Sequence, residues 1–213
     1  MSKPKMTVGA VLTGDIVNST QLSPTQGTEL LKVLAQFLKG YRHEFYRGDS
    51  FQVFVKEPSK ALRLAVVCRA VAIDITAKEE GAIRGDIRIG IGIGEVDSPV
   101  RRPGSAKGEA FLLSGRELDE LQKTDRRLAI RCGNKIANIG LQVMADYLDN
   151  IFLGMTGKQA DLIVELLQGA TQQQLSISRE KAKSTISELA NAGRWPEIER
   201  MLQQYEQLIE LLS

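Results

Sequence analysis

Aromatic residues are scarce in this chain of 213 residues: Phe, Trp and Tyr make up 5%, although 43% of the residues are hydrophobic. The core must therefore be built from Leu, Ile, Val and Ala, in one large domain or in a domain with a small helical extension. The charged content of 25% is ordinary for a soluble globular protein. The single histidine, His43, has no nucleophile motif beside it, and we expect it on the surface of a strand.

Cysteine is rarer still, with Cys68 in an apolar helical run and Cys132 after a predicted strand. Neither has the spacing of a metal ligand. We expect two reduced packing thiols, which fits a cytoplasmic location. The N-terminus lacks the apolar segment of a signal peptide, and no apolar run reaches the roughly 18 residues that span a bilayer.

The chain also lacks a strong excess of charge of either sign, since 28 Lys and Arg face 26 Asp and Glu, a net charge of +2. Overall charge therefore indicates no particular partner. The charge is unevenly divided, because residues 1–131 carry 21 basic and 16 acidic side chains, net +5, and residues 132–213 carry 7 and 10, net −3. An acidic C-terminal part is a poor electrostatic footprint for nucleic acid.

Hydrophobic periodicity predicts the order β-α-β-β-α-β-α-β over residues 1–131. The expected strands cover residues 7–14, 41–47, 50–55, 86–96 and 128–130, and the expected helices cover 25–40, 58–79 and 109–122, the last with Phe111, Leu112, Leu118 and Leu121 buried. Short connections, and helices long enough to cover a sheet, favour an α+β fold. We expect a ferredoxin-like or palm arrangement with a mainly antiparallel sheet.

Glycines alternate with isoleucines in the expected strand 86–96, so that Gly90, Gly92 and Gly94 share one face. A bare face of this kind indicates the close approach of another backbone, a ligand or a helix. The loop that follows, 97–107, is basic through Arg101, Arg102 and Lys107. It is either a solvated connection or a loop that faces phosphate.

Beyond residue 132 the pattern is helical throughout, so we divide the chain into domains at 1–131 and 132–213. Asn134 and Thr156 are expected to cap two helices, the first with Ile136, Ile139 and Val143 among its apolar residues. Thr171 and Ser178 are expected to open short helices, and Trp195-Pro196 starts the last one. No low-complexity linker separates the two parts, so we expect them to pack closely.

Two aspartates beside strands form the most informative pattern. Asp15 follows an apolar run at 8–12, and an aspartate just past a buried strand is costly unless something pairs with it. Asp49 lies in the expected hairpin, beside which the first strand of a βαββ unit lies. The two carboxylates could therefore bind Mg²⁺ together, while amides at 18–20 hold phosphate oxygens. The alternative is that both aspartates only cap turns.

Several motifs resemble the class III nucleotidyl cyclases. Gly14-Asp15-Ile16-Val17-Asn18-Ser19-Thr20 resembles their metal-binding strand end, and Arg47-Gly48-Asp49-Ser50-Phe51 resembles their second metal-aspartate hairpin. The strand from Arg88 to Val96 is similar to their Gly-Glu-Val strand, and the helix from Gly108 to Arg116 to the one with their transition-state residues. The likeness covers residues 7–131.

The resemblance implies a site for a nucleoside triphosphate with Mg²⁺ or Mn²⁺. Its residues would be metal ligands at Asp15, the Ile16 carbonyl and Asp49, phosphate contacts at Asn18, Ser19 and Thr20, and a catalytic Arg116. In the cyclases the metal aspartates and the arginine come from different subunits. A head-to-tail homodimer, with Arg116 facing the aspartate of a partner chain, follows from that arrangement.

The likeness is incomplete at the residues that position ribose and base. Leu112 stands where the cyclases have a ribose-positioning Asn, and Phe45 and Ser105 stand at the base-reading positions. Because the metal ligands are kept and these residues are not, the sequence favours nucleotide binding over efficient cyclisation.

The cyclase-like part together with the helical tail resembles the SatD family, small bacterial proteins with a Gly-Asp-Ile-x-x-Ser start and a helix-turn-helix-like tail. Thr156-Gly157-Lys158-Gln159 is similar to the opening of that tail, although a charged run, 179–181, replaces the usual glycine of the turn. A recognition helix would present Arg179, Lys181, Lys183 and Ser184 to DNA. The alternative is a packing or dimerisation module, with an apolar stripe of Leu202, Tyr205, Leu208, Ile209 and Leu212.

Three functions remain open. The leading one is a cytoplasmic regulatory protein of the SatD type, which binds a metal–nucleotide and couples it to a DNA-binding-like tail in transcription regulation. The second is an active metal-dependent nucleotidyl cyclase or another phosphoryl-transfer enzyme. The third is a catalytically dead dimerisation scaffold. None of them calls for a membrane.

Overall fold

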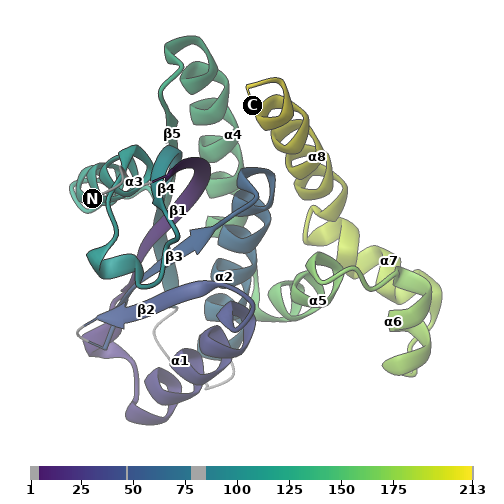
Figure 1. Ribbon diagram of the computed structural model, residues 1–213. Coiled ribbons are helices and arrows are strands. Elements are labelled where there is room, and N and C mark those ends of the chain that lie inside the picture. The colour runs from purple at the N-terminus through teal and green to yellow at the C-terminus, as the bar shows by residue number, and fades with distance from the viewer. Residues whose placement is uncertain (1–4, 47, 78–84, 213) are drawn as a thin grey trace.

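The computed structural model describes residues 5–46, 48–77 and 85–212, in which a five-stranded sheet carries eight α-helices (Figure 1). The predicted order of elements up to residue 131 is confirmed. The elements are β1 Lys5–Val17, α1 Pro24–Leu38, β2 Arg42–Tyr46, β3 Ser50–Val55, α2 Ala61–Thr76, β4 Asp86–Ser98, α3 Glu109–Leu121 and β5 Leu128–Cys132. The tail comprises α4 Lys135–Gly154, α5 Gly157–Leu167, α6 Gln172–Ser178, α7 Lys183–Ala192 and α8 Trp195–Leu211. Arg47 and the expected end of the second helix, 78–79, lie outside the described residues.

The strand order is β2-β3-β1-β4-β5, antiparallel throughout except for the parallel pair β4–β5. β1 is longer than predicted, because it pairs with β4 from Lys5 to Val17. Asp15 therefore lies within the strand, opposite Ser50 on β3 and Arg88 on β4. The expectation that Asp15 stands just past the strand is wrong.

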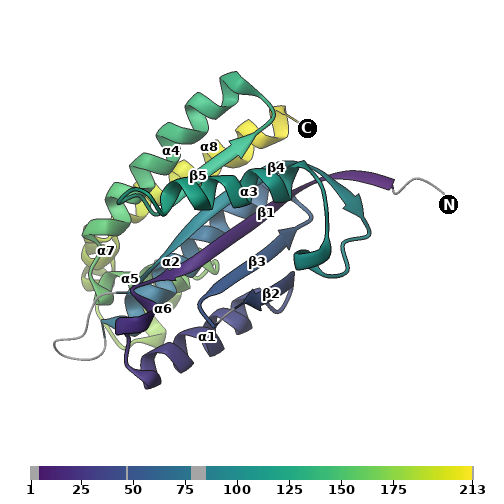
Figure 2. The same cartoon turned by 90° about the vertical axis from the view of Figure 1, so that its left-hand side faces the viewer.

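The two faces of the sheet are covered in different ways. The isoleucine face of β4 packs into the main core, under α1, α2 and α4. On the glycine face lies α3, which crosses β4 and β1 on the side facing the viewer in Figure 2. A Cβ at Gly92 would lie 2.2 Å from the Ala110 carbonyl oxygen, and one at Gly90 would lie 2.4 Å from that of Ser114. The predicted close approach is confirmed, and a helix makes it.

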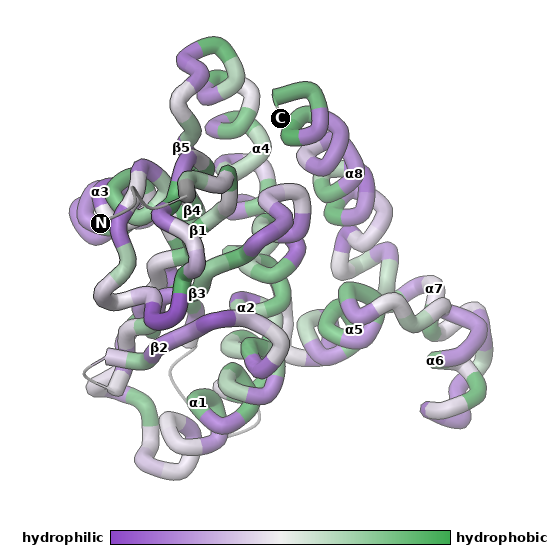
Figure 3. The backbone as a smooth tube through the Cα atoms, in the orientation of Figure 1, coloured by the Kyte–Doolittle hydropathy of each residue, from purple (hydrophilic) through white to green (hydrophobic). Residues whose placement is uncertain are grey.

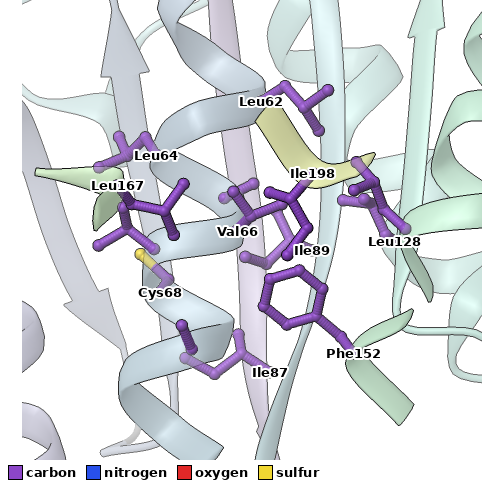
Figure 4. Close-up of a cluster of buried hydrophobic side chains, with 14 of the residues drawn as sticks. Leu62, Leu64, Val66, Cys68, Ile87, Ile89, Leu128, Phe152, Leu167 and Ile198 are labelled. Carbon is purple, nitrogen blue, oxygen red and sulfur yellow. The ribbon is translucent and has the colours of Figure 1, made fainter. Parts of the chain in front are cut away.

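Helix α2 is buried on nearly all sides and lies at the centre of the core (Figure 4). Around it gather side chains of both predicted domains, including Ile89 of β4, Phe152 of α4 and Ile198 of α8. One buried cluster thus spans residue 132. Both cysteines are free and buried, as expected, and burial raises the pKa of the Cys68 thiol to about 12. Among the described residues, no helix has the length and apolarity that crossing a bilayer requires.

A buried ion cluster ties the sheet to the tail, and periodicity did not reveal it. Arg69 of α2 is 0% exposed; its Nε and Nη2 donate to Asp86 at 3.0 and 2.7 Å, and its Nη1 donates to Asp149 of α4 at 2.5 Å. Asp149 Oδ2 also accepts the Arg127 backbone amide at 2.7 Å. Each charge is paired and hydrogen-bonded, which is the condition for burying it.

Capping predicted the tail helices well. Asn134 Oδ1 accepts the amides of Ile136 and Ala137 at 3.0 and 3.1 Å. Thr156 and Thr171 open α5 and α6 with capping boxes. Hydrophobic and hydrophilic residues alternate along the tail helices (Figure 3). In α8, Leu202, Tyr205 and Ile209 of the predicted apolar stripe are buried within the chain.

Two expectations about the helices are wrong. Ser178 ends α6 instead of opening a helix, because Glu180 takes the left-handed φ of 50° and α7 begins only at Lys183. Leu112 is 52% exposed rather than buried, because α3 turns its opposite side to the glycine face. On α4, for which no buried side was predicted, Ile136, Ile139 and Val143 are exposed, because Leu141, Ala145 and Leu148 fill the core side of that helix.

Candidate functional site

Asp15 projects from the glycine face of the sheet and is only 9% exposed. Both of its carboxylate oxygens lie 3.3 Å from Nη1 of Arg88, its neighbour on β4. Gln122, just past α3, donates to Oδ2 at 2.8 Å. The ion pair uses a single guanidinium nitrogen, so it is looser than a two-nitrogen contact.

Asp49 lies at the end of the β2–β3 hairpin, next to this strand. Its backbone carbonyl accepts the Ile16 amide at 2.8 Å, and its carboxylate accepts the hydroxyls of Ser19 at 2.9 Å and Ser50 at 3.3 Å. The structure therefore brings together Ile16, Ser19 and Asp49. Asp15 is one residue away along the chain.

The turn after β1 contributes the remaining predicted phosphate contacts. Asn18 takes a left-handed φ of 58° and leads into a 3₁₀ turn, Ser19–Gln21; asparagine tolerates this backbone better than most residues. Asn18 and Thr20 are exposed, whereas Ser19 is half-buried against Asp49. Only Ser19 of the three is engaged with a metal-site candidate.

Arg116, the predicted catalytic residue, is exposed on α3. The residues that α3 buries against the sheet are Ala110, Ser114, Glu117, Leu118 and Leu121. Arg116 projects from the other side, together with Leu112. Within one chain the structure does not bring it to the aspartates.

Arg88 is the residue that sequence reasoning missed. Its Nε is buried and has no hydrogen-bond partner within the part of the chain that the structure describes. A buried donor without a partner is costly, so this guanidinium has unused capacity to bind an acceptor. The alternation of β4 held the signal, because Arg88 is on the same face as Gly90 and Gly92.

A polar row continues from Asp15 along the glycine face. Gln52 Nε2 donates to the Thr13 hydroxyl at 3.1 Å, and the Thr13 and Ser114 hydroxyls share a hydrogen bond of 2.8 Å. Such residues are unusual at the contact between a helix and a sheet, where apolar contacts dominate. This end of the sheet is chemically suited to a polar ligand.

The basic loop at 97–107 folds back onto β2. Glu44 Oε2 accepts both the Gly104 amide and the Tyr46 hydroxyl at 2.8 Å. The Tyr46 hydrogen bond lowers the pKa of Glu44, and burial, followed by Glu44, raises the pKa of Tyr46. The side chains of Arg101, Arg102 and Lys107 remain exposed.

The residues at the predicted base-reading positions lie on neighbouring elements, because the turn with Ser105 packs against β2, which carries Phe45. Phe45 packs against Phe51 with ring centroids 6.0 Å apart. Ser105 is exposed in the 3₁₀ turn Pro103–Ser105. The single histidine, His43, lies half-buried on β2, as expected for a strand residue.

The predicted DNA-binding residues fall into two groups. Lys181, Lys183 and Ser184 are exposed around the start of α7. Arg179 instead bridges to α5, where it pairs with Asp161 at 2.7 Å and also with Glu165. Its guanidinium holds the turn to α5 and is not part of the exposed basic group.

A metal held by the protein alone does not fit this site. Among the described residues, no group of three or more His, Cys, Asp and Glu is placed to bind an ion. Two aspartates and a carbonyl suit Mg²⁺, which takes one or two carboxylates and completes its shell with water and substrate phosphates. The two carboxylates have separate partners in the structure, Arg88 and Gln122 for Asp15 and Ser19 and Ser50 for Asp49.

No protein-family model and no curated protein matches the chain. Nucleotidyl cyclase domains are among the solved structures with a similar fold. A bacterial light-regulated adenylyl cyclase is 14% identical at a TM-score of 0.45, over 61% of this chain and 44% of the cyclase. The chain thus spans less than half of that protein.

Two further cyclase domains show the same level of likeness. The guanylyl cyclase domain of the RhoGC fusion protein from the aquatic fungus Blastocladiella emersonii is 20% identical at a TM-score of 0.40, over 55% of this chain and 76% of that domain. The active GGEEF domain of a diguanylate cyclase from Vibrio cholerae is 14% identical at 0.43, over 60% and 84%. These identities are too low to transfer the role of any residue. The predicted likeness to the SatD family is not shown and stays a prediction.

Proposed function

We propose that this chain binds a nucleoside triphosphate together with Mg²⁺ or Mn²⁺ at the end of β1 and the β2–β3 hairpin. The observation that carries the proposal is the Ile16–Asp49 backbone hydrogen bond of 2.8 Å, which fixes the second aspartate beside the strand that bears Asp15. Asp15, Asp49 and the Ile16 carbonyl would hold the metal. The bound metal would neutralise charge on the phosphates.

Arg88 supports this assignment independently of the aspartates. It sits beside Asp15 with an Nε that has no partner among the described residues, and guanidinium groups are suited to binding phosphate oxygens. Ser19, with the amides around Asn18 and Thr20, would take further phosphate oxygens. The polar row from Asp15 to Thr13 would border the rest of the ligand.

We propose a regulatory role as the leading function, in which the nucleotide state reaches the tail. The support is the buried cluster of Arg69, Asp86 and Asp149, since Asp86 lies two residues from Arg88 on β4 and Asp149 lies on α4. The turn from α6 to α7, which leaves Lys181, Lys183 and Ser184 exposed, would present these residues to DNA in the manner of a helix-turn-helix.

A cyclase or another phosphoryl-transfer enzyme is the second candidate. It is favoured by one observation: Arg116 is exposed on the outer side of α3 and free to enter a partner's site. Pyrophosphate release from each nucleoside triphosphate with Mg²⁺ or Mn²⁺ tests this candidate. Pyrophosphate release by wild type that disappears in Arg116→Ala would show that the protein is an enzyme. If no nucleoside triphosphate gives pyrophosphate, nucleotide binding without catalysis is the function that stays.

Thermal shift tests the binding proposal. Wild type should gain stability with a metal–nucleotide, Asp49→Ala should lose that gain, and Asp119→Ala, an exposed aspartate on α3, should keep it. If wild type shows no shift with any nucleoside triphosphate in either metal, the proposed function is wrong.

The DNA contact has its own test. A mobility shift with random-sequence DNA should weaken when Lys181 and Lys183 are both changed to Ala. A matched change of the exposed Lys158 on α5 should have no effect. Unchanged binding in the double variant, or no binding by wild type, would remove the DNA-binding part of the proposal.

A further inference from the structure

Helix α4 carries an apolar stripe that the described part of its own chain leaves uncovered. Ile136, Ile139 and Val143 are 82%, 70% and 64% exposed. Their spacing of three and four residues aligns them along one side of the helix over about two turns. Exposed large apolar side chains in a contiguous row mark an interaction surface more often than isolated ones do.

The stripe is not needed for the core of the chain. The opposite side of α4 supplies Leu141, Ala145 and Leu148, each 0% exposed, to the main hydrophobic cluster. Helix α4 is therefore apolar on two sides, of which one packs into the core and the other is exposed. The upper part of α4 is seen beside the C-terminal end of α8 in Figure 3.

Gly140 lies in the middle of the stripe, and nothing in its own chain requires a glycine there. Beyond the adjoining backbone of α4, a Cβ built on Gly140 would meet no atom of the described residues within 4 Å. In the interior of a helix, glycine is less stable than every other residue except proline. A glycine between Ile139 and Val143 does, however, form a hollow into which a large side chain can fit.

We propose that a second copy of this chain packs against the stripe, with the two α4 helices antiparallel about a two-fold axis near Gly140. In this register Ile139 of each copy lies over Gly140 of the other, and Ile136 lies against Val143. The stripe is then complementary to itself, as a two-fold interface requires. Large side chains over small ones give the close packing of helix pairs.

The charges along the stripe favour the same occupant and the same direction. Lys135 and Asp146 are both exposed and flank the stripe on the same side, at its two ends. An antiparallel pair brings Lys135 of each copy next to Asp146 of the other, whereas a parallel pair keeps them apart. Asp146 Oδ1 already meets Arg126 at 2.9 Å and accepts Gln142 Nε2 at 2.7 Å, but the side chain remains 52% exposed, so Oδ2 can accept a further partner.

This interface is separate from the proposed nucleotide site. Helix α4 covers the isoleucine face of the sheet, whereas Asp15 and α3 lie on the glycine face. The dimer therefore does not depend on metal or nucleotide, and loss of the dimer should leave the nucleotide thermal shift intact.

Sedimentation velocity over a range of concentrations tests the proposal. Wild type should be a dimer, and Ile139→Lys should weaken dimerisation about thirtyfold or more, as for an interface hot spot. Leu153→Lys, on the same helix but off the stripe, should remain dimeric. Circular dichroism shows that each variant keeps its helices.

Gly140→Leu is the sharper variant, because it fills the hollow while it improves the helix. It should dissociate the dimer without lowering the melting temperature of the monomer. Lys135→Glu should weaken dimerisation, and the double change Lys135→Glu with Asp146→Lys should restore it. A monomeric wild type, or a dimer unaffected by Ile139→Lys and Gly140→Leu, overturns the proposal. So does a dimer that only Leu112→Lys, on α3, disrupts.

Discussion

Two arginine–aspartate groups lie near the same end of β4, and they differ in how completely they are paired. Arg69 is fully buried and meets two carboxylates through three guanidinium nitrogens. Arg88 is partly exposed, touches Asp15 through one nitrogen, and leaves its Nε without a partner among the described residues. A guanidinium whose nitrogens all have partners is saturated and holds the fold together. One with a nitrogen left over is unsaturated and can still bind a ligand. We assign structure to the first group and ligand binding to the second.

The largest effect should come from breaking the saturated group. Arg69→Ala leaves Asp86 and Asp149 buried without their counter-ion, which should cost about 3–5 kcal/mol of unfolding free energy. Urea denaturation measures this loss, with Arg63→Ala on the same helix, whose ion pair is half-exposed, as the control. A loss below about 1 kcal/mol would mean that the cluster is not what joins the sheet to α4.

The unsaturated group should respond in the opposite way. Arg88→Ala should lower the affinity for a metal–nucleotide at least about tenfold, or about 1.4 kcal/mol, because a phosphate contact is lost. Its unfolding free energy should fall by no more than about 1 kcal/mol, as for a partly exposed ion pair. Titration calorimetry and urea denaturation of one preparation give both values. Unchanged affinity with a large loss of stability would reverse our assignment.

A pH titration distinguishes the buried core from the open site. Burial raises the pKa of Cys68 from 9.0 to about 12. The neutral thiol therefore contributes its full share of the unfolding free energy below pH 9, and this share is lost as the pH rises toward 12. The unfolded thiol ionises first, which should cost about 1 kcal/mol of stability by pH 10. Cys68→Ala should make the decline between pH 9 and 10 shallower. An equally steep decline in that variant would place the alkaline sensitivity elsewhere.

The smallest effect should come from the polar neighbour of Asp15. Gln122→Ala removes one hydrogen bond of 2.8 Å at an exposed residue, and should cost about 0.5 kcal/mol of unfolding free energy. Thermal or urea denaturation resolves this from the effect of Arg69→Ala. A cost of several kcal/mol would show that Asp15 belongs to the structural group.

Local signals predicted much of the fold. Asn134, Thr156 and Thr171 correctly predicted where their helices begin, because an N-cap hydrogen bond joins residues only two or three positions apart. The alternating glycines of β4 predicted a close approach for the same reason. Asp15 was misplaced because the end of a strand depends on its partners, and β1 is extended by pairing with β4.

Contacts distant in sequence explain the other failures. Arg69 is 17 residues from Asp86 and 80 from Asp149, so no window of the sequence contains the cluster. Periodicity placed Ile136 and Leu141 on one helix but could not say which apolar side meets the core. The proposed site was predicted at Asp15 and Asp49, whereas Arg88 emerged only from strand register.

The glycines of β4 also have a mechanical consequence. Because α3 rests on bare backbone at Gly90 and Gly92, no layer of side chains separates the two elements and absorbs small displacements by changing rotamer. Helix and strand must therefore move as one stiff lever, about 20 Å long for the 13 residues of α3. Gln122 holds Asp15 at one end, and Gly108 bridges to Val96 at the other. A ligand that displaces Asp15 would thus also shift the backbone around Gly108 and Val96, at the far end of α3.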